Sequence, residues 1–265
     1  MSVTIVSCFY HIEKSKFNLF HYVTWMVNFF KIKTNKIIYT DKKTFNYLFS
    51  KINIENIKFI IYEIDDFKVS KDYTIEQWWE QYKMDPEQSY HSIELYKIWN
   101  EKSNFIKKSI EKNPFESDYF YYCDVGCFRD DKKIDNFINW PNIEKVKKKG
   151  IGDKFTILSV FPFTKDDLKY KDTDDLFKFL NINRLGGGII GGSKEACLEW
   201  HQLFYKMMQT YFQNDKFAGK DQSIMASVYL KTFNTDKDKC EKLFNLVKVA
   251  NPFCNPWFYL QDYFN

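Results

Sequence analysis

Apolar and polar positions follow two different periods along the first part of the chain. The run VTIVSCF at 3–9 is apolar and rich in β-branched side chains, which is typical of a buried strand. Residues 15–31 instead carry apolar side chains at helical spacing, and Ser15 is the expected N-cap. Two more apolar runs, 36–41 and 57–65, predict strands. The order strand, helix, strand, strand predicts a parallel α/β sheet.

The middle of the chain continues this pattern with a helix and two strands. A helical face starts at Pro86 and ends at an Asn-Pro stop at 113–114. The aromatic stretch 118–126 predicts a strand that reaches a turn, and 154–163 predicts another strand. The sequence has no repeat, no low-complexity linker and no clean boundary, so we expect one domain over residues 1–265.

Two helices are predicted in the last third of the chain. One, at 193–212, follows a glycine segment and has Ser193 as its expected N-cap. The other begins near GKDQSI, 219–224, where Asp221 is well placed as the N-cap, and from these residues alone that structural role is favoured. A carboxylate at a helix start can also face a cleft and act as a base or hold a sugar hydroxyl.

Composition favours a packed globule. Hydrophobic residues make up 45% and aromatic residues 20% of the chain, unlike a disordered protein. The longest apolar run, 22–30, is interrupted by Thr24 and Asn28 and is shorter than the roughly 20 residues of a membrane span. The start MSVTIVSCFY lacks a basic leader, and the six scattered cysteines lack metal-site spacing. We therefore expect a soluble, cytoplasmic protein with reduced thiols.

The net charge of +4 is small, but the choice of basic residue is uneven. Only two of the 39 basic residues are arginine, Arg129 and Arg184, and the abundance of Lys, Asn, Ile, Phe and Tyr is what an AT-rich coding sequence would produce. Lysine richness is then weak evidence for nucleic-acid binding, and KVKKKG at 145–150 is more simply a solvated loop. In a chain that uses lysine almost everywhere, Arg129 and Arg184 could stand where a planar guanidinium that donates two parallel hydrogen bonds is needed.

The first candidate site is CDVGCFRD, 123–130. Asp124 stands at the end of a predicted strand, where ligands of open α/β sheets bind. Its carboxylate could bind a divalent cation or a ribose hydroxyl, and Gly126 would let a phosphate or sugar approach the backbone. Aspartate and glycine are also common turn formers, so from this segment alone a plain turn is equally well supported.

The second candidate site is RLGGGIIGGSK, 184–194. It contains a G-x-G-x-x-G match at 186–191, but no convincing strand leads into it, so a nicotinamide-binding fingerprint is poorly supported. The order Ser193-Lys194 reverses that of a P-loop, which argues against nucleotide hydrolysis. Bare backbone amides could line a ligand here. The alternative is a flexible loop, against which the two central isoleucines argue.

The histidines predict no catalytic site. His21, His91 and His201 lie in helical stretches beside aromatic residues and are expected to be partly buried and satisfied. The sequence contains no His-Glu-x-x-His and no Gly-x-Ser-x-Gly, so metalloprotease and serine-hydrolase activities are unsupported.

The predicted elements come in the order of an amino-terminal strand-helix-strand half, an acidic strand end, a glycine-rich segment and an Asp-Gln helix start. This order resembles a glycosyltransferase of the GT-A fold. More narrowly, YFYYCDVGCFRD at 119–130, with the helix SYHSIELYKIWNEKSNFIKKSI at 89–110 before it, resembles the HtrL/YibB-like family of proposed glycosyltransferases, which carry an Asp-x-Gly-x-x-Arg-Asp-like signature. The resemblance implies a single GT-A-like, Rossmann-like α/β domain with a central, mainly parallel sheet flanked by helices. It also implies a nucleotide-binding half at 1–130 and an acceptor-side half at 131–265.

The resemblance implies a nucleotide-sugar donor, with a UDP-sugar preferred, and a hydroxyl acceptor on a glycan or protein. Asp221 and Gln222 match an Asp-Gln pair beside the transferred sugar and are the implied catalytic residues, with Asp221 either deprotonating the acceptor or positioning the donor. The alternative is a catalytically lapsed protein that only binds a nucleotide sugar or glycan. The implied donor-binding residues are Ser7, Phe9, Tyr10, Asp41, Asp124, Gly126, Arg129, Arg184, Gly187 and Gly188.

The resemblance also implies an Asp-x-Asp-type motif, with Asp124 as its matching acid, facing a ribose or a metal, Mn²⁺ or Mg²⁺. This chain departs from that metal site at two points. Gly126 removes the second carboxylate, and no histidine follows His201 to complete a metal site. Asp124 would hold the metal alone or with help from Asp130 or Asp262. Without a metal, an arginine or a lysine would have to meet the charge of the diphosphate.

Overall fold

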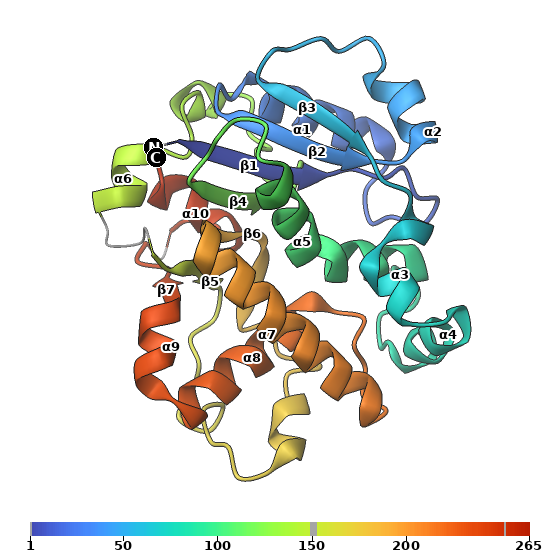
Figure 1. The fold of residues 1–265 in the computed structure, drawn as a ribbon, viewed down its shortest axis with the longest axis vertical. Coiled ribbons are helices and arrows are strands. Elements are labelled where there is room, and N and C mark those ends of the chain that lie inside the picture. Colours follow the sequence, from blue (N-terminus) through green and yellow to red (C-terminus); the bar gives the residue numbers. More distant parts are fainter. Residues whose placement is uncertain (1, 149–152, 252) are drawn as a thin grey trace.

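Seven strands form one twisted sheet at the centre of the structure (Figure 1). The computed structural model describes residues 2–148, 153–251 and 253–265. The strands are β1 (Val3–Cys8), β2 (Asn35–Thr40), β3 (Ile57–Ile61), β4 (Tyr119–Cys123), β5 (Phe155–Ser159), β6 (Leu185–Ser193) and β7 (Phe244–Lys248). They stand in the order β3-β2-β1-β4-β6-β5-β7, and among these described strands only β6 runs antiparallel to its neighbours. The predicted α/β fold with a mainly parallel sheet is confirmed.

Helices cover both faces of the sheet. They are α1 (Leu19–Lys31), α2 (Lys42–Thr44), α3 (Lys68–Asp72), α4 (Ile75–Met84), α5 (Ile93–Lys112), α6 (Ile143–Lys148), α7 (Lys194–Gln213), α8 (Asp221–Thr235), α9 (Lys237–Leu243) and α10 (Tyr259–Tyr263). In Figure 1, α5 and α7 lie in front of the sheet and α1 lies behind it. Phe120 and Tyr122 of β4 pack into the core on the α5 side, whereas Tyr121 and Cys123 pack into the core on the α1 side. Burial on both faces explains the uninterrupted apolar strands.

Two helices begin later than predicted. The N-cap of α1 is Asn18, whose side chain accepts a hydrogen bond from a first-turn amide, and not Ser15. The helical face expected from Pro86 is interrupted, because the residues after Pro86 form turns and α5 starts only after its N-cap, Ser92. α5 ends where predicted, at Asn113, which adopts the left-handed conformation with φ 33°.

The glycine segment is a strand. Residues 185–193 form β6, which pairs with both β4 and β5. A Cβ on Gly191 would lie 2.2 Å from the Phe120 carbonyl oxygen, and one on Gly192 would lie 2.0 Å from the Lys154 carbonyl oxygen. Glycine is required here because neighbouring backbones approach too closely for a side chain. The segment is thus itself a strand and not the flexible loop that the sequence leaves open as the alternative.

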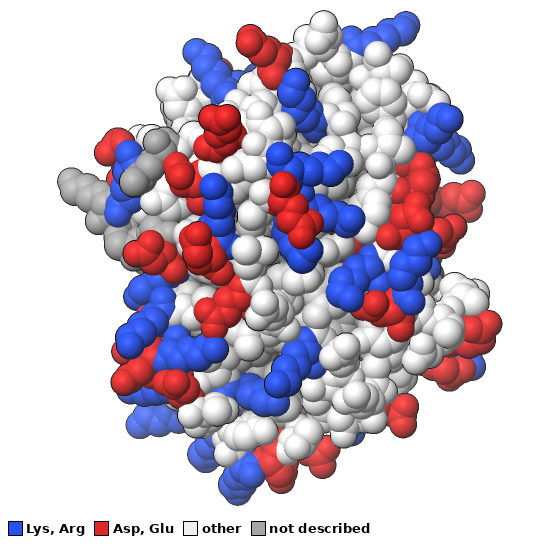
Figure 2. Space-filling view, in the orientation of Figure 1, with Lys and Arg blue, Asp and Glu red and all other residues white. Residues whose placement is uncertain are grey.

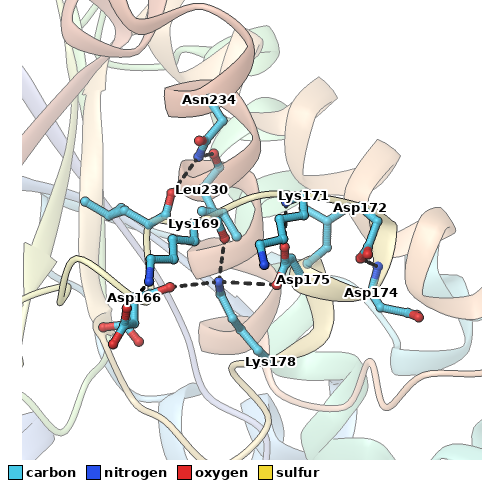
Figure 3. A network of polar contacts seen from close by, with 12 residues as sticks. Asp166, Lys169, Lys171, Asp172, Asp174, Asp175, Lys178, Leu230 and Asn234 are labelled. Atoms are coloured by element: carbon cyan, nitrogen blue, oxygen red, sulfur yellow. Dashed lines mark hydrogen bonds and ion pairs between the residues drawn. The ribbon is translucent and has the colours of Figure 1, made fainter.

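The long connection between β5 and β6 is held by side-chain contacts to backbone groups (Figure 3). Lys178 Nζ donates to the carbonyl oxygens of Lys169 at 2.7 Å and Asp166 at 3.3 Å. Asn234 of α8 donates to the Leu168 carbonyl oxygen at 3.1 Å. The connection is therefore tied to α8, the helix that begins beside the cleft described below.

Charged side chains of both signs are mixed on the face shown in Figure 2, so that face presents no continuous basic surface. Of the predicted basic loop, residues 145–148 lie in α6, and 149 and 150 lie outside the described residues. None of the helices formed by the described residues combines the length and the hydrophobicity that crossing a bilayer requires. All six cysteines are free thiols.

Candidate functional site

A cleft of about 910 Å³ opens at the carboxyl ends of β1 and β4. β1 pairs with β2 on one side and with β4 on the other, so the strand order turns back at this point of the sheet. Open α/β sheets form their ligand crevices at such a point. Beyond the residues that follow these two strands, the cleft is lined by side chains of α5, by the start of α8 and by the segment before α10.

Asp124 directly follows β4 and lines the cleft. Its backbone amide donates to the Gly188 carbonyl oxygen at 2.8 Å, and the Tyr122 hydroxyl donates to its Oδ1 at 2.8 Å. The Cys127 amide donates back to the Asp124 carbonyl oxygen at 3.0 Å, which closes a turn. The side chain of Asp124 is nevertheless 42% exposed. The segment therefore forms a turn and also presents a carboxylate to the cleft.

Lys102 of α5 joins two carboxylates at the floor of the cleft. Its Nζ lies 3.1 Å from Asp221 Oδ2 and 3.7 Å from Asp124 Oδ1. The same Nζ donates to the Gly187 carbonyl oxygen at 3.0 Å. The side chains of Lys102 and Asp221 are only 6% and 8% exposed. The three charged groups therefore form one polar cluster, in which a buried ammonium is balanced by carboxylates.

The cluster sets the protonation of its own members. Burial alone would lower the pKa of Lys102, but Asp124 and Asp221 raise that pKa above its ordinary value. The partly buried position of Asp124 at the floor of the cleft raises its pKa, while the Lys102 ammonium acts in the opposite direction. Lys102 therefore keeps its charge, and Asp124 takes up a proton more readily than an aspartate on an open surface.

Two glycines of β6 let the carboxylates lie against the strand. A Cβ on Gly187 would lie 2.6 Å from Asp221 Oδ2, and one on Gly188 would lie 3.4 Å from Asp124 Oδ2. Asp221 is the first residue of α8, and Lys220 holds the N-cap position. The carboxylate of Asp221 faces the lysine of α5 and does not cap its helix, so the favoured N-cap role is wrong.

Arg129 presents a guanidinium to the cleft from an aromatic support. Its guanidinium carbon lies 4.1 Å from the ring centre of Trp25, 5.0 Å from that of Phe258 and 5.1 Å from that of Phe17. Its Nε donates to the Gly126 carbonyl oxygen at 2.7 Å. Arg129 is exposed, and no carboxylate in the described part of the chain forms an ion pair with it. Its other N–H groups are therefore free to meet an anion.

Three of the predicted donor-binding residues do not line the cleft. Ser7 is buried and donates to the carbonyl oxygen of the last residue of β4 at 2.6 Å. Asp41 caps α2 and accepts hydrogen bonds from the amide and the hydroxyl of Thr44. Arg184 forms an ion pair with Asp167 at 2.8 Å. The predicted residues that do line the cleft are Phe9, Tyr10, Asp124, Gly126, Arg129, Gly187, Gly188, Asp221 and Gln222.

Lys102 was not among the predicted site residues, although the sequence holds a signal for it. It lies four residues after Ile98 and four before Ile106, both of which are buried, so it stands on the apolar face of α5. The abundance of lysine in the chain hides this signal. His91 also lines the cleft, from the loop before α5, where the sequence indicated a satisfied helical histidine.

The residues around Asp124 do not fit the implied metal site. Divalent cations take several oxygen ligands, but no group of three or more His, Cys, Asp or Glu side chains within the described residues is arranged to hold a metal ion. The ammonium of Lys102, 3.7 Å from Asp124 Oδ1, would repel a cation there. The expected helpers, Asp130 and Asp262, are not among the residues that line the cleft.

Comparison with known proteins identifies a family without an assigned activity. A family model described as "Bacterial protein of unknown function (HtrL_YibB)" matches residues 1–250. No curated protein matches the chain.

Two solved structures share part of the arrangement of elements. The apo crystal structure of mouse xyloside xylosyltransferase 1 has a TM-score of 0.45 and 12% identity, over 93% of this chain and 85% of that chain. The 4-diphosphocytidyl-2C-methyl-D-erythritol synthase of Anaerococcus prevotii has a TM-score of 0.37 and 11% identity, over 98% and 96% of the two chains. Both TM-scores lie below 0.5, a level of likeness that assigns no activity.

Proposed function

The chain belongs to the HtrL_YibB family, whose model it matches over residues 1–250, and we propose that this member transfers a sugar from a nucleotide-sugar donor to a hydroxyl acceptor. A UDP-sugar is the preferred donor, and the acceptor is a hydroxyl of a glycan or protein. The observation that carries the proposal is the cluster of Asp124, Lys102 and Asp221 at the floor of the cleft. It lies where the strand order of the sheet turns back, the usual site of nucleotide ligands in such folds.

The polar cluster suits the hydroxyl groups of a sugar. Sugar hydroxyls donate hydrogen bonds, and the partly exposed carboxylate of Asp124 can accept them from a ribose or a hexose. The Lys102 ammonium counteracts the effect of burial on the pKa of Asp124 and favours its charged form, which strengthens such bonds. Gly187 and Gly188 leave no side chain between the sugar and the strand.

Arg129 is the group best suited to the diphosphate. Its guanidinium has no carboxylate partner among the described residues and is held in place by three aromatic rings. Arginine can donate two parallel hydrogen bonds to phosphate oxygens, and it would stabilise the negative charge that develops as the diphosphate leaves. Because the residues around Asp124 do not fit a metal site, we assign this role to the protein's own cation.

Aromatic side chains near Arg129 suit the nucleobase of the donor. Phe9 and Tyr22 have ring centres 5.5 Å apart, and Phe17 lies 6.4 Å from Tyr22 in the same group. All three line the cleft, and aromatic rings of this kind stack on bases with little dependence on base identity.

A binding protein without catalysis is the second candidate. Its specific support is the contact between Asp221 and Lys102, because this carboxylate is nearly buried and is already engaged by a cation. This candidate shares the donor site but predicts no release of nucleotide.

The experiment that tests the proposal measures binding and turnover together. Nucleotide sugars are screened by calorimetry and by nucleotide release, in parallel with Mn²⁺, with Mg²⁺ and with a chelator. Transfer that persists in the chelator supports the proposal, and a strict requirement for Mn²⁺ contradicts the assignment of Arg129. Binding without release supports the second candidate, and the absence of both excludes both.

A matched variant shows whether the polar cluster is the site that the screen detects. Asp124→Asn keeps the volume of the side chain but weakens its hydrogen bonds to hydroxyls. We expect donor binding to be lost while the melting temperature stays close to that of the wild type. Loss of folding would instead mean that Asp124 is a structural residue.

A further inference from the structure

His91 and Asp85 form a hydrogen-bonded pair at the wall of the cleft. His91 lies in the loop between α4 and α5, and its Nδ1 is 2.7 Å from Asp85 Oδ2. The side chain of His91 is 13% exposed and lines the cleft, whereas that of Asp85 is fully buried. A carboxylate behind an imidazole orients the ring and selects its tautomer.

Asp85 is held as a carboxylate. The Tyr96 hydroxyl donates to its Oδ2 at 2.6 Å, and the Glu87 amide donates to its Oδ1 at 2.8 Å. Burial alone would raise the pKa of Asp85, but these hydrogen bonds and that of His91 lower the pKa below its ordinary value. The charged carboxylate accepts from Nδ1–H, so in the neutral form of the imidazole the lone pair stands on Nε2. None of the residues that the structure describes makes a hydrogen bond to Nε2.

This pair is joined to the polar cluster of the cleft. Lys220, the residue before Asp221, forms an ion pair with Glu87 in the loop that carries His91. The ring centre of Trp99 is 5.0 Å from that of His91, and Trp99 stands on α5 about one turn before the lysine of the cluster. The imidazole therefore lies on the wall of the same cleft as the cluster, on the side of α5 that carries Trp99.

The carboxylates of the cluster are already engaged by the buried ammonium of Lys102. Asp221 is 8% exposed and lies 3.1 Å from the Lys102 ammonium. Asp124 shares the same ammonium, and Glu87 is paired with Lys220. The hydrogen bond from Lys220 lowers the pKa of Glu87. Asp221 and Asp124 both contact Lys102, and the proposed function assigns Asp124 to the donor sugar. The imidazole of His91 instead contacts its carboxylate through Nδ1, so its second ring nitrogen is not engaged by Asp85 and can accept a proton.

We propose that His91, oriented by Asp85, is the general base of the transfer. This inference rests on the proposed function. The acceptor oxygen forms a bond to the anomeric carbon of the donor sugar while the bond from that carbon to the diphosphate oxygen breaks. The hydroxyl proton passes to His91 Nε2, and the nucleoside diphosphate leaves with the electron pair of the broken bond. Direct displacement inverts the configuration at the anomeric carbon, and Asp85 acts as a positioning residue.

The test compares three variants with the wild type. His91→Ala is expected to lower kcat on the order of 10²–10⁴-fold, the usual contribution of a general base. Affinity for the nucleoside diphosphate, measured by calorimetry, should not change, and added imidazole should restore part of the rate. Asp85→Asn should lower kcat without raising KM for the donor. Tyr90→Ala is the control, because Tyr90 is an exposed neighbour of His91 and is not among the cleft-lining residues.

The outcomes separate this inference from the proposed function. Transfer by His91→Ala at the wild-type rate, the lack of rescue by imidazole, or a product with retained configuration would each overturn the role of His91. If the wild type neither binds a nucleoside diphosphate nor transfers a sugar, the proposed function fails first. Should His91→Ala not fold, His91→Gln keeps a donor for Asp85, and the same loss of kcat at unchanged nucleotide affinity is expected.

Discussion

A side chain at position 126 would contact the ring that supports Arg129. A Cβ on Gly126 would lie 3.1 Å from Trp25 Cε3 and 3.8 Å from Arg129 Nη2. An aspartate there would therefore need the Trp25 ring to shift, and it would place its carboxylate beside the guanidinium. Gly126 and Arg129 thus belong together, because the glycine leaves room for the aromatic support and its carbonyl oxygen accepts from Arg129 Nε.

Replacing Arg129 tests the diphosphate role directly. Arg129→Lys keeps the charge but loses the planar fork, so affinity for a nucleoside diphosphate should fall by roughly tenfold, or about 1.4 kcal/mol. Affinity for the nucleoside should not change. Arg184→Lys is the matched control, since Arg184 pairs with Asp167 and does not line the cleft. Equal effects of the two substitutions in calorimetry would contradict the assignment.

Replacing Lys102 tests the polar cluster. Lys102→Met leaves the nearly buried Asp221 without its cation, which should lower the free energy of unfolding on the order of 3–5 kcal/mol. Adding Asp221→Asn removes the unpaired charge and should restore part of that loss. Urea unfolding of the single and double variants measures both effects. If the double variant is no more stable than the single one, the two side chains are not coupled.

Strands and helix starts differ in how far the sequence predicts them. A buried strand is a continuous apolar run, so β1 and β4 fall within the predicted ranges. A helix start depends on which of several capping residues makes the bond: Ser193 caps α7 as predicted, but Asn18 takes the place expected for Ser15. The glycine strand, residues 185–193, carries too few side chains for a period-2 pattern, and only the partner backbones explain it.

His201 of α7 is buried against α5, and it predicts a pH dependence of the free energy of unfolding. Burial first, and then Lys107 and Lys68, lower the pKa of His201 to about 4. The unfolded chain binds a proton at the ordinary histidine pKa of roughly 6.5. Between these values the unfolded state binds more protons, so stability rises with pH over that window and is lost as pH falls.

A substitution isolates this contribution. His201→Gln should remove on the order of 3 kcal/mol from the rise in unfolding free energy between about pH 4 and 6.5. The glutamine can keep a hydrogen bond to Ser103 Oγ, which lies 3.2 Å from His201 Nδ1. Urea unfolding at several pH values gives the slope. An unchanged slope in the variant would mean that other groups cause the dependence.

The cleft is assembled from parts of the chain that are far apart in sequence. Asp124 and Asp221 could be chosen as candidates because each stands at the end or start of an element. Their meeting at Lys102 depends on how α5 crosses the sheet, which no local pattern contains. The same limit applies to His91, whose partner Asp85 is visible only once the loop between α4 and α5 has folded.

Ligand binding should stabilise the whole molecule. A nucleoside diphosphate at about 100 times its Kd adds about 2.7 kcal/mol to the free energy of unfolding, which raises Tm by a few degrees. Scanning calorimetry with and without the nucleotide measures the shift. At the same nucleotide concentration, Arg129→Lys should show a smaller shift than the wild type. No shift in the wild type at any concentration would argue against a nucleotide site.

The charges that line the cleft have a consequence for the rate at which a donor arrives. Four basic and four acidic side chains line it: Lys16, Lys102, Arg129, Lys220, Glu13, Glu87, Asp124 and Asp221. Their formal charges cancel, so the opening exerts little long-range attraction on an anionic nucleotide. Encounter should then proceed by unsteered diffusion and change little with ionic strength, and discrimination among nucleotides should appear as differences in how long each stays bound.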